Sequence, residues 1–316
     1  MPRKKTPPTK RPLPASTLDP VGPARKVAAT AKVYDLVQGE GYVALAAQGK
    51  RSSMEDAFSC DIADDAGGVN LYGVYDGHGG NGCSGYCKRF LLSTIRAKLR
   101  SGVDKALVDS FQTTDRKYCE LCEIEESRVD GSTAVVVAHD TFEDRLHVAN
   151  VGDSRAIVVQ NKVAGYAELS EVHLPSIPSE QKRIEALGGH IVQDKAGTLR
   201  VEGVLMVSRS IGDSYLKKFV SGEPTTRTFD VDPERDHCVV LASDGLFDYM
   251  EPEELSKVFR DAKNMDELKI LCERVVGTTI GRGSEDNVTI LVIPLRPSLK
   301  APGDSRRNSS ICCDDD

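Results

Sequence analysis

Four segments far apart in the sequence each place an aspartate next to an apolar, β-branched run. They are Val74–Gly80, Val151–Arg155, Leu241–Gly245 and Glu285–Asn287. If they meet in space, the carboxylates repel one another, by roughly 4 kcal/mol for a pair about 4 Å apart at an effective dielectric near 20. Protonation or a bound divalent cation relieves this repulsion, and hard oxygen ligands suit magnesium, manganese or calcium. The pattern indicates a metal-dependent hydrolase.

The segment Asp76-Gly77-His78 combines groups suited to metal binding and to proton transfer. A glycine after the aspartate lets the backbone turn sharply and lets its carbonyl approach an ion. A histidine beside a metal ligand is well placed to move a proton. Taken alone, this segment is explained equally well as a tight turn after a strand.

Arg51, Glu55 and Asp56 form a second charged group within a short stretch of chain. In the company of the aspartates, we expect the planar fork of Arg51 to bind a phosphate. We expect Glu55 and Asp56 to bind metal through waters. A surface loop with local ion pairs is the alternative.

Asp244 and Asp248 lie four residues apart, so one turn of chain could direct both at one site. Asp286 is followed by Asn287 and a clear strand pattern, which anchors it. Structural capping would explain any one of these aspartates. It does not explain all of them together.

Hydrophobic patterns predict the elements that must position these residues. Strand-like runs include 71–75, 132–139, 146–151, 156–160, 238–242 and 288–293. Helical candidates are 84–99, 103–124, 180–187, 252–262 and 265–280. A short polar link over 139–145 predicts an antiparallel hairpin between the strands on either side of it.

The order of these elements predicts the fold class. Helices come in pairs between groups of strands, which favours antiparallel sheets covered by helices over a doubly wound parallel sheet. The apolar run Ala134–Ala138 is expected to be buried on both faces, one against helices and the other against a second sheet. We therefore expect an α+β domain over residues 27–296.

The formal charge of −7 on the 316 residues is unevenly distributed. Residues 1–26 are basic and proline-rich, with about +6, and leave about −13 on the remainder. We expect 1–26 and 297–316 to be disordered tails. The acidic body argues against nucleic acid as a ligand, but bound metals would admit an anionic substrate.

Other features bound the class of protein. The nine cysteines are irregularly spaced, so neither a disulfide framework nor a zinc site is expected. No apolar run is long enough for a membrane helix, and the N-terminus lacks the apolar core of a secretory signal. The expected location is cytoplasmic or nuclear, or both. Without a heptad pattern, a monomer is the default expectation.

Together these segments resemble the motif series of the metal-dependent type 2C serine/threonine protein phosphatases. The motifs, in chain order, are Arg51–Asp56, Val74–Gly80, Gly131–Ala134, Gly152–Arg155, Ser208–Asp213, Ser243–Asp248 and Asp286–Asn287. The resemblance spans about residues 40–294. It implies a four-layer α-β-β-α sandwich, with two central antiparallel sheets flanked by helices.

The resemblance also implies two Mn²⁺ or Mg²⁺ ions, with a third bound more weakly. By position, Asp76 would bridge the two ions. The other implied ligands are Asp244 and Asp286 on one ion, the Gly77 carbonyl on the other, Glu55 through a water, and Asp153 and Asp248 near the third.

The implied reaction is hydrolysis of phosphoserine and phosphothreonine in phosphoprotein substrates. A water that bridges the two ions would attack phosphorus directly. Arg51 would bind the phosphate, and His78 would be the general acid. The competing interpretation is a related binding module that recognises phosphoproteins without hydrolysing them.

Two departures from the family pattern stand out. Val172-His173-Leu174-Pro175 lies where the family often has Asp-His-Lys-Pro, and Phe247 where tryptophan is common. Neither change involves an expected ligand, so we expect altered surroundings rather than lost activity.

Overall fold

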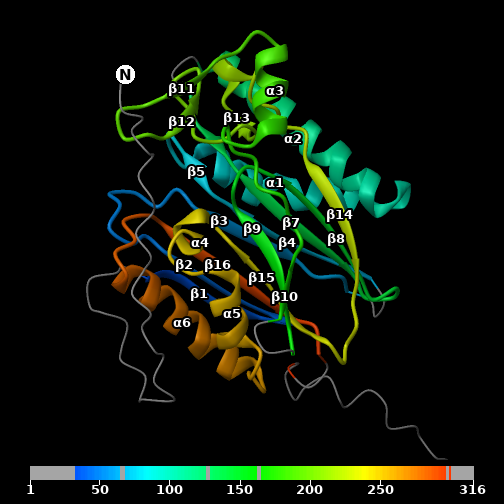
Figure 1. Cartoon of the computed structure of the whole chain (residues 1–316). Coiled ribbons are helices and arrows are strands. Elements are labelled where there is room, and N and C mark those ends of the chain that lie inside the picture. Colours follow the sequence, from blue (N-terminus) through cyan, green and yellow to red (C-terminus); the bar gives the residue numbers. More distant parts are fainter. Residues whose placement is uncertain (1–32, 65–67, 126–128, 162–164, 297–298, 300–316) are drawn as a thin grey trace, which may run out of the picture.

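The computed structural model describes residues 33–64, 68–125, 129–161, 165–296 and 299. Two antiparallel sheets lie face to face, and helices cover both outer faces (Figure 1). This arrangement confirms the predicted four-layer sandwich. The predicted tails at 1–26 and 297–316 lie outside the described residues, apart from Leu299.

The first sheet has the strand order β1-β2-β16-β15-β9-β10. Its strands are β1 (Val33–Gly39), β2 (Tyr42–Ala47), β16 (Val288–Pro294), β15 (Asp236–Ala242), β9 (Arg155–Gln160) and β10 (Tyr166–Glu168). Its outer face packs against α5 (Pro252–Phe259) and α6 (Met265–Gly281).

The second sheet has the order β14-β8-β7-β4-β3. Its strands are β14 (Thr225–Asp230), β8 (Arg145–Val151), β7 (Ala134–Asp140), β4 (Val69–Tyr75) and β3 (Ala57–Asp61). Its outer face packs against α1 (Gly82–Lys98) and α2 (Val103–Ile124).

Strand β7 shows how the two faces are built. Val135 and Val137 face the other sheet, whereas Ala134, Val136 and Ala138 face the helices, and all five are fully buried. Successive side chains on a strand point to opposite faces, so an unbroken apolar run is what a doubly covered strand requires. The pairing of β7 with β8 confirms the predicted antiparallel hairpin.

Short elements complete the fold. They are β5 (Gly77–His78), β6 (Gly131–Ser132), α3 (Pro178–Ala186), β11 (Ile191–Gln193), β12 (Leu199–Val201), β13 (Ile211–Gly212) and α4 (Asp244–Phe247). Figure 1 places α3, β11 and β12 together at one end of the molecule. Among the described residues, no helix has both the length and the apolar character needed to cross a bilayer.

Some sequence predictions differ from the structure. The helix expected over 252–262 ends at Phe259, and the strand expected over 132–139 divides at Thr133 into β6 and β7. Strands β1, β2, β3 and β14 were not predicted. β14 is a largely exposed edge strand with few apolar residues, and β2 is rich in alanine, which has low strand propensity.

The sheets gather the aspartate segments at one edge. β4, β8 and β15 run directly into Asp76, the segment of Asp153, and Asp244. Asp286 precedes β16, the antiparallel neighbour of β15, so the start of one strand lies beside the end of the other. The predicted convergence therefore follows from strand directions.

The interface between the sheets makes a quantitative prediction. Leu241 is fully buried there, so Leu241→Ala should lower the free energy of unfolding by about 2–5 kcal/mol. The measurement is urea denaturation followed by circular dichroism. Val192→Ala, at a half-exposed position, is the control and should change it by less than about 0.5 kcal/mol. Equal effects of the two substitutions would contradict this account of the core.

Candidate metal centre and active site

A cavity of about 330 Å³ lies at the strand ends. It collects the predicted site residues from both sheets and their loops. Those that line it are Arg51, Glu55, Asp76, Gly77, His78, Asp153, Asp244 and Asp286. Of the other two predicted residues, Asp56 is buried behind the cavity wall, and Asp248 lines an adjoining groove.

A glycine makes the approach of Asp244 and Asp286 possible. A Cβ atom at Gly245 would lie 2.0 Å from the backbone oxygen of Asn287 and 3.2 Å from Cβ of Asp286. No side chain fits in that space. Gly245 therefore lets the first turn of α4 pack directly against the segment that carries Asp286.

Asn287 ties the Arg51–Asp56 loop to the same place. Its side-chain oxygen accepts a hydrogen bond from the Glu55 N–H at 2.8 Å, and its amide group donates to the carbonyls of Gln48 and Ser53. Three hydrogen bonds from one buried side chain fix the loop against β16.

Asp56 is held from the other side. The hydroxyl of Ser243 donates to the Asp56 carboxylate at 2.8 Å and accepts from the N–H of Thr289. This contact joins the carboxyl end of β15 to the loop. Asp56 is thus a buried member of the cluster rather than a cavity-lining one.

The carboxylates of this cluster repel one another. Burial raises the pKa of Asp56, Asp76, Asp153 and Asp244, and the negative charges of neighbouring aspartates raise each further. The Asp76 and Asp244 carboxyls lie close enough that each shifts the pKa of the other. The carboxylates therefore cannot all ionise together without a compensating cation.

The donor set fits divalent cations. In the described part of the chain, no lysine or arginine forms an ion pair with Asp56, Asp76, Asp153 or Asp244. Hard, anionic oxygens that are withdrawn from water and lack a counter-charge are what Mg²⁺ and Mn²⁺ bind. Among the described residues, no three acidic, histidine or cysteine side chains converge closely enough to form a complete metal site by themselves.

Arg51 lies at the mouth of the cavity. Its Nη2 atom is 2.6 Å from Oδ2 of Asp286, and its side chain is 55% exposed. One of the five guanidinium donors serves this contact, and the exposed part of the group faces solvent.

Glu55, in the loop before β3, and Gly77, in β5, both line the cavity. The Glu55 carboxylate accepts hydrogen bonds from Ser53 and from the N–H of Gly80. A Cβ atom at Gly77 would lie 2.4 Å from the Glu55 carbonyl oxygen, so the two backbones are in direct contact.

His78 is bound through one ring nitrogen. Its Nε2 atom lies 2.8 and 3.0 Å from the two carboxylate oxygens of Asp213, which is fully buried. Burial alone would lower the pKa of His78, but the hydrogen bond and charge of Asp213, with help from Asp153 and Asp130, raise it.

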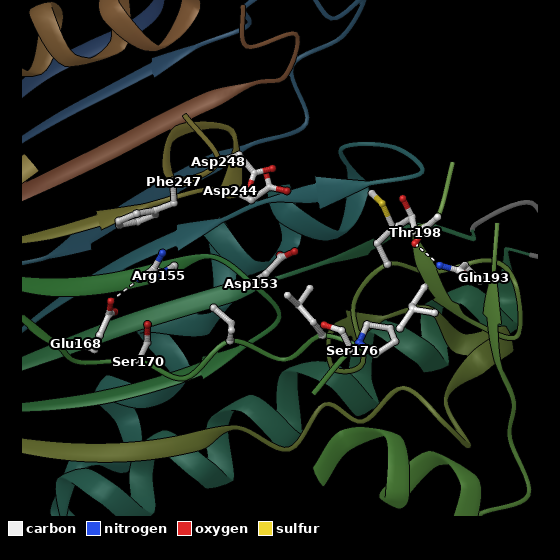
Figure 2. Close-up of a pocket in the computed structure, with 16 residues that line it drawn as sticks. Asp153, Arg155, Glu168, Ser170, Ser176, Gln193, Thr198, Asp244, Phe247 and Asp248 are labelled. Atoms are coloured by element: carbon white, nitrogen blue, oxygen red, sulfur yellow. Dashed lines mark hydrogen bonds and ion pairs between the residues drawn. The ribbon is translucent and has the colours of Figure 1, made fainter. Parts of the chain in front are cut away.

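A larger groove of about 800 Å³ adjoins the cavity, and Asp153 and Asp244 line both. Figure 2 shows these two aspartates with Asp248 between two groups of groove residues. On one side Arg155 pairs with Glu168 and lies 4.6 Å from the centre of the Phe247 ring. On the other side lies the β11–β12 hairpin.

The comparisons with known proteins agree with this geometry. Residues 40–288 match the model of the protein phosphatase 2C family. The chain belongs to the protein phosphatase 2C family. This confirms the type 2C resemblance noted from the motifs.

Relatives in this family extend over most of the chain. "Probable protein phosphatase 2C 71" of Arabidopsis thaliana is 38% identical over 277 residues, which are 85% of this chain and 58% of the relative. "Probable protein phosphatase 2C 59" of the same species is 38% identical over 250 residues, 78% of this chain and 76% of the relative. The chain spans between half and two thirds of the length of several other curated relatives.

Solved structures share the fold. A Caenorhabditis elegans sex determining protein aligns with a TM-score of 0.75 at 29% identity, over 83% of this chain and 66% of that one. A serine-threonine phosphatase 2C from Toxoplasma gondii aligns with a TM-score of 0.72 at 21% identity, over 84% of this chain and 98% of its own. The second likeness concerns the fold alone.

Sequence reasoning gave no role to three residues that this 2C-family site uses. They are Asp213, Ser243 and Asn287. Each lies in a motif that was noted, but its partner is distant in the chain. The available signal was that each of these polar residues lies in one motif and could bind a residue of another motif.

The raised pKa values predict an unusual pH dependence of stability without metal. The pKa is about 6 for Asp244, about 7 for Asp56 and about 8 for Asp153, against an ordinary 3.8. The native state then holds more protons than the unfolded state, so stability should fall as the pH rises from 5 to 8. Thermal unfolding in the presence of a chelator measures this.

The same experiment has two internal checks. Mn²⁺ should raise the melting temperature most at pH 8, where the carboxylates are most ionised. Asp76→Asn should flatten the pH dependence, because it removes one repelling charge from the cluster. A melting temperature that rises from pH 5 to 8 without metal would contradict the electrostatic account.

Proposed function

We propose that this chain is a metal-dependent protein phosphatase that hydrolyses phosphoserine and phosphothreonine in proteins. The observation that carries the proposal is the cluster of buried carboxylates without a counter-charge, in a chain of the protein phosphatase 2C family. Repulsion of this kind persists in a folded protein when the site serves a function that requires it.

In this proposal the cluster binds two Mn²⁺ or Mg²⁺ ions and a weaker third. Asp76 and Asp244 are the central ligands, because both line the cavity and burial among neighbouring aspartates raises the pKa of each. The remaining ligands are Asp286, the Gly77 carbonyl, Glu55 through a water, and Asp153 and Asp248 toward the groove. Asp56 supports the cluster from behind through Ser243. The chemistry that such ions supply is a nucleophilic water at neutral pH and charge neutralisation at the phosphoryl group.

Arg51 would bind the phosphate. It stands at the cavity mouth and uses one of its donors on Asp286, so its other donors can meet phosphoryl oxygens. A guanidinium there offsets the charge on the equatorial oxygens as the bond to the leaving group breaks. The contact with Asp286 sets the direction of the side chain before substrate arrives.

His78 would give a proton to the departing serine or threonine oxygen. These alcohols are poor leaving groups as alkoxides, so a proton donor at that position lowers the barrier. The position of the ring on the cavity wall, with a raised pKa, supports this role.

The groove would receive the protein chain that flanks the phosphorylated residue. It joins the cavity, and Val172, Leu174 and Met206 give it an apolar wall. The first two occupy the positions where the family often has an acid and a base. Substrates with apolar residues near the phosphorylated residue fit this surface best. We further propose that the protein acts as a monomer in the cytoplasm or nucleus.

The decisive experiment is release of inorganic phosphate from a phosphothreonine peptide by the purified full chain. Activity should require Mn²⁺ or Mg²⁺ and disappear with a chelator. Asp244→Asn should lower kcat about 10³-fold or more, because a lost ligand forfeits several kcal/mol of charge stabilisation. Asp230→Asn, at an exposed position on β14, is the matched control and should retain full activity.

The control measurement is the stability of the metal-free Asp244→Asn protein. It should match or exceed that of the wild type, because the substitution relieves repulsion. A wild-type chain that binds phosphopeptides but never releases phosphate would overturn the proposal in favour of a binding module.

The groove gives a separate prediction. Leu174→Asp should lower kcat/KM about tenfold for a peptide with leucines beside the phosphothreonine, because covering a leucine side chain is worth roughly 1.5–3 kcal/mol. Hydrolysis of 4-nitrophenyl phosphate, which has no flanking chain, should stay within about twofold. Phe142→Asp, an 83% exposed position outside the groove, is the control. Equal losses on both substrates would refute the role of the groove.

A further inference from the structure

We propose that Asp213 is a positioning residue that fixes the imidazole of His78, so that the open Nδ1 atom meets the leaving oxygen of the substrate. This proposal rests on the proposed function. It assigns a role to a residue outside the expected ligands and phosphate-binding groups. Three independent features of the structure support it.

The first feature is the contact itself. Both oxygens of Asp213 lie within 3.0 Å of Nε2 of His78, and Asp213 is completely buried while the His78 side chain is 28% exposed. Nδ1 of His78 has no hydrogen-bond partner among the described residues and is not buried. The hydrogen bond made by one ring nitrogen of a histidine determines what the other ring nitrogen can do. Nδ1 is therefore the atom available to substrate.

The second feature is the backbone around Asp213. Gly212 and Asp213 are consecutive residues with φ of 83° and 48°, and the left-handed region is uncommon for a residue other than glycine. Surrounding contacts hold this conformation. They are the Asp213 N–H to the Asp130 carbonyl, the Gly212 N–H to the Asp115 carboxylate, and the hydroxyl of Ser210 to the Asp213 carboxylate. A strained backbone that its neighbours over-determine is typical of functional sites.

The third feature is the space that lets the two side chains meet. Strand β6 lies between β5 and β13, and Gly131 of β6 pairs with both His78 and Gly212. A Cβ atom on Gly131 would lie 2.1 Å from the Asp213 carboxylate and 2.5 Å from Nε2 of His78. The contact between His78 and Asp213 therefore crosses β6 at a position that only glycine can occupy.

The two other acids near His78 either bind other groups or belong to the carboxylate cluster. The Asp130 carboxylate accepts from the hydroxyl of Tyr118 and the N–H of Cys83. Asp153 belongs to the carboxylate cluster. Asp213 is thus the acid that holds the imidazole ring.

The proposed step balances as follows. The bond from phosphorus to the ester oxygen breaks, and that oxygen keeps the electron pair and takes the proton from Nδ1. A water oxygen bonds to phosphorus and releases a proton to solvent. The neutral imidazole keeps its proton on Nε2, where it is hydrogen-bonded to the Asp213 carboxylate. Nδ1 then regains a proton from solvent, which restores the starting state.

The test is the dependence of kcat on the leaving group, with small substrates that do not touch the groove. 4-Nitrophenyl phosphate releases a stable phenolate, whereas phenyl phosphate needs a proton on its leaving oxygen. With Mn²⁺ present, Asp213→Asn should leave kcat for 4-nitrophenyl phosphate within about threefold of the wild type. It should lower kcat for phenyl phosphate by about 10²-fold or more. A neutral asparagine cannot supply the carboxylate charge that holds the Nε2–H and supports the doubly protonated ring, so the ring becomes a poorer proton donor at Nδ1.

A second variant guards against misfolding of the first. Gly131→Ala inserts a methyl group between the two side chains and should show the same selective loss. Gly85→Ala is the matched control, since a Cβ atom there meets nothing within 4 Å, and it should behave as the wild type. In a His78→Asn background, Asp213→Asn should add no further loss, because the two residues act as one unit.

Several results would overturn the proposal. Equal loss on both substrates in Asp213→Asn and Gly131→Ala would show a purely structural role. So would unchanged hydrolysis of phenyl phosphate, or additive losses with His78→Asn. These results would leave the proposed phosphatase activity intact. Wild-type protein that hydrolyses neither ester would overturn both proposals.

Discussion

Mutual repulsion among carboxylates at one edge of two sheets is the constraint on which the rest of the structure depends. Asp76, Asp153 and Asp244 are carried there by strands that run in the same direction, and burial makes their charges costly. The rigid interface between the sheets holds them together in spite of that cost. A divalent cation turns the same repulsion into binding energy, which couples metal affinity to folding.

The arrangement depends on close backbone contacts and on polar side chains behind the site. Gly245 and Gly131 remove side-chain volume where two segments must touch. Ser243 and Asn287 fasten the Asp56 loop to β15 and β16. Such supporting residues set the positions of ligands and catalytic groups within a fraction of an ångström, so their loss changes chemistry without touching substrate.

The cavity and the groove adjoin each other and share Asp153 and Asp244. In the proposed function, the cavity holds the groups that act on a phosphate, and these lie in the motifs by which the chain resembles the protein phosphatase 2C family. The adjoining groove carries residues that depart from it, namely Val172, Leu174 and Phe247. Much of the groove wall comes from the loop over residues 170–176 and from the β11–β12 hairpin, so this part can vary without disturbing the cluster.

The sequence by itself predicted the family and the layered architecture, and most of its candidate site residues line one cavity. The apolar run at Ala134–Ala138 predicted a doubly covered strand, because side chains alternate between faces. Exposed β14 carried no such pattern and was missed. Only tertiary structure decided that Asp213 meets His78 across Gly131, and that Arg51 contacts Asp286. Local patterns encode burial and direction, whereas contacts between distant segments depend on strand order and packing, which no single segment specifies.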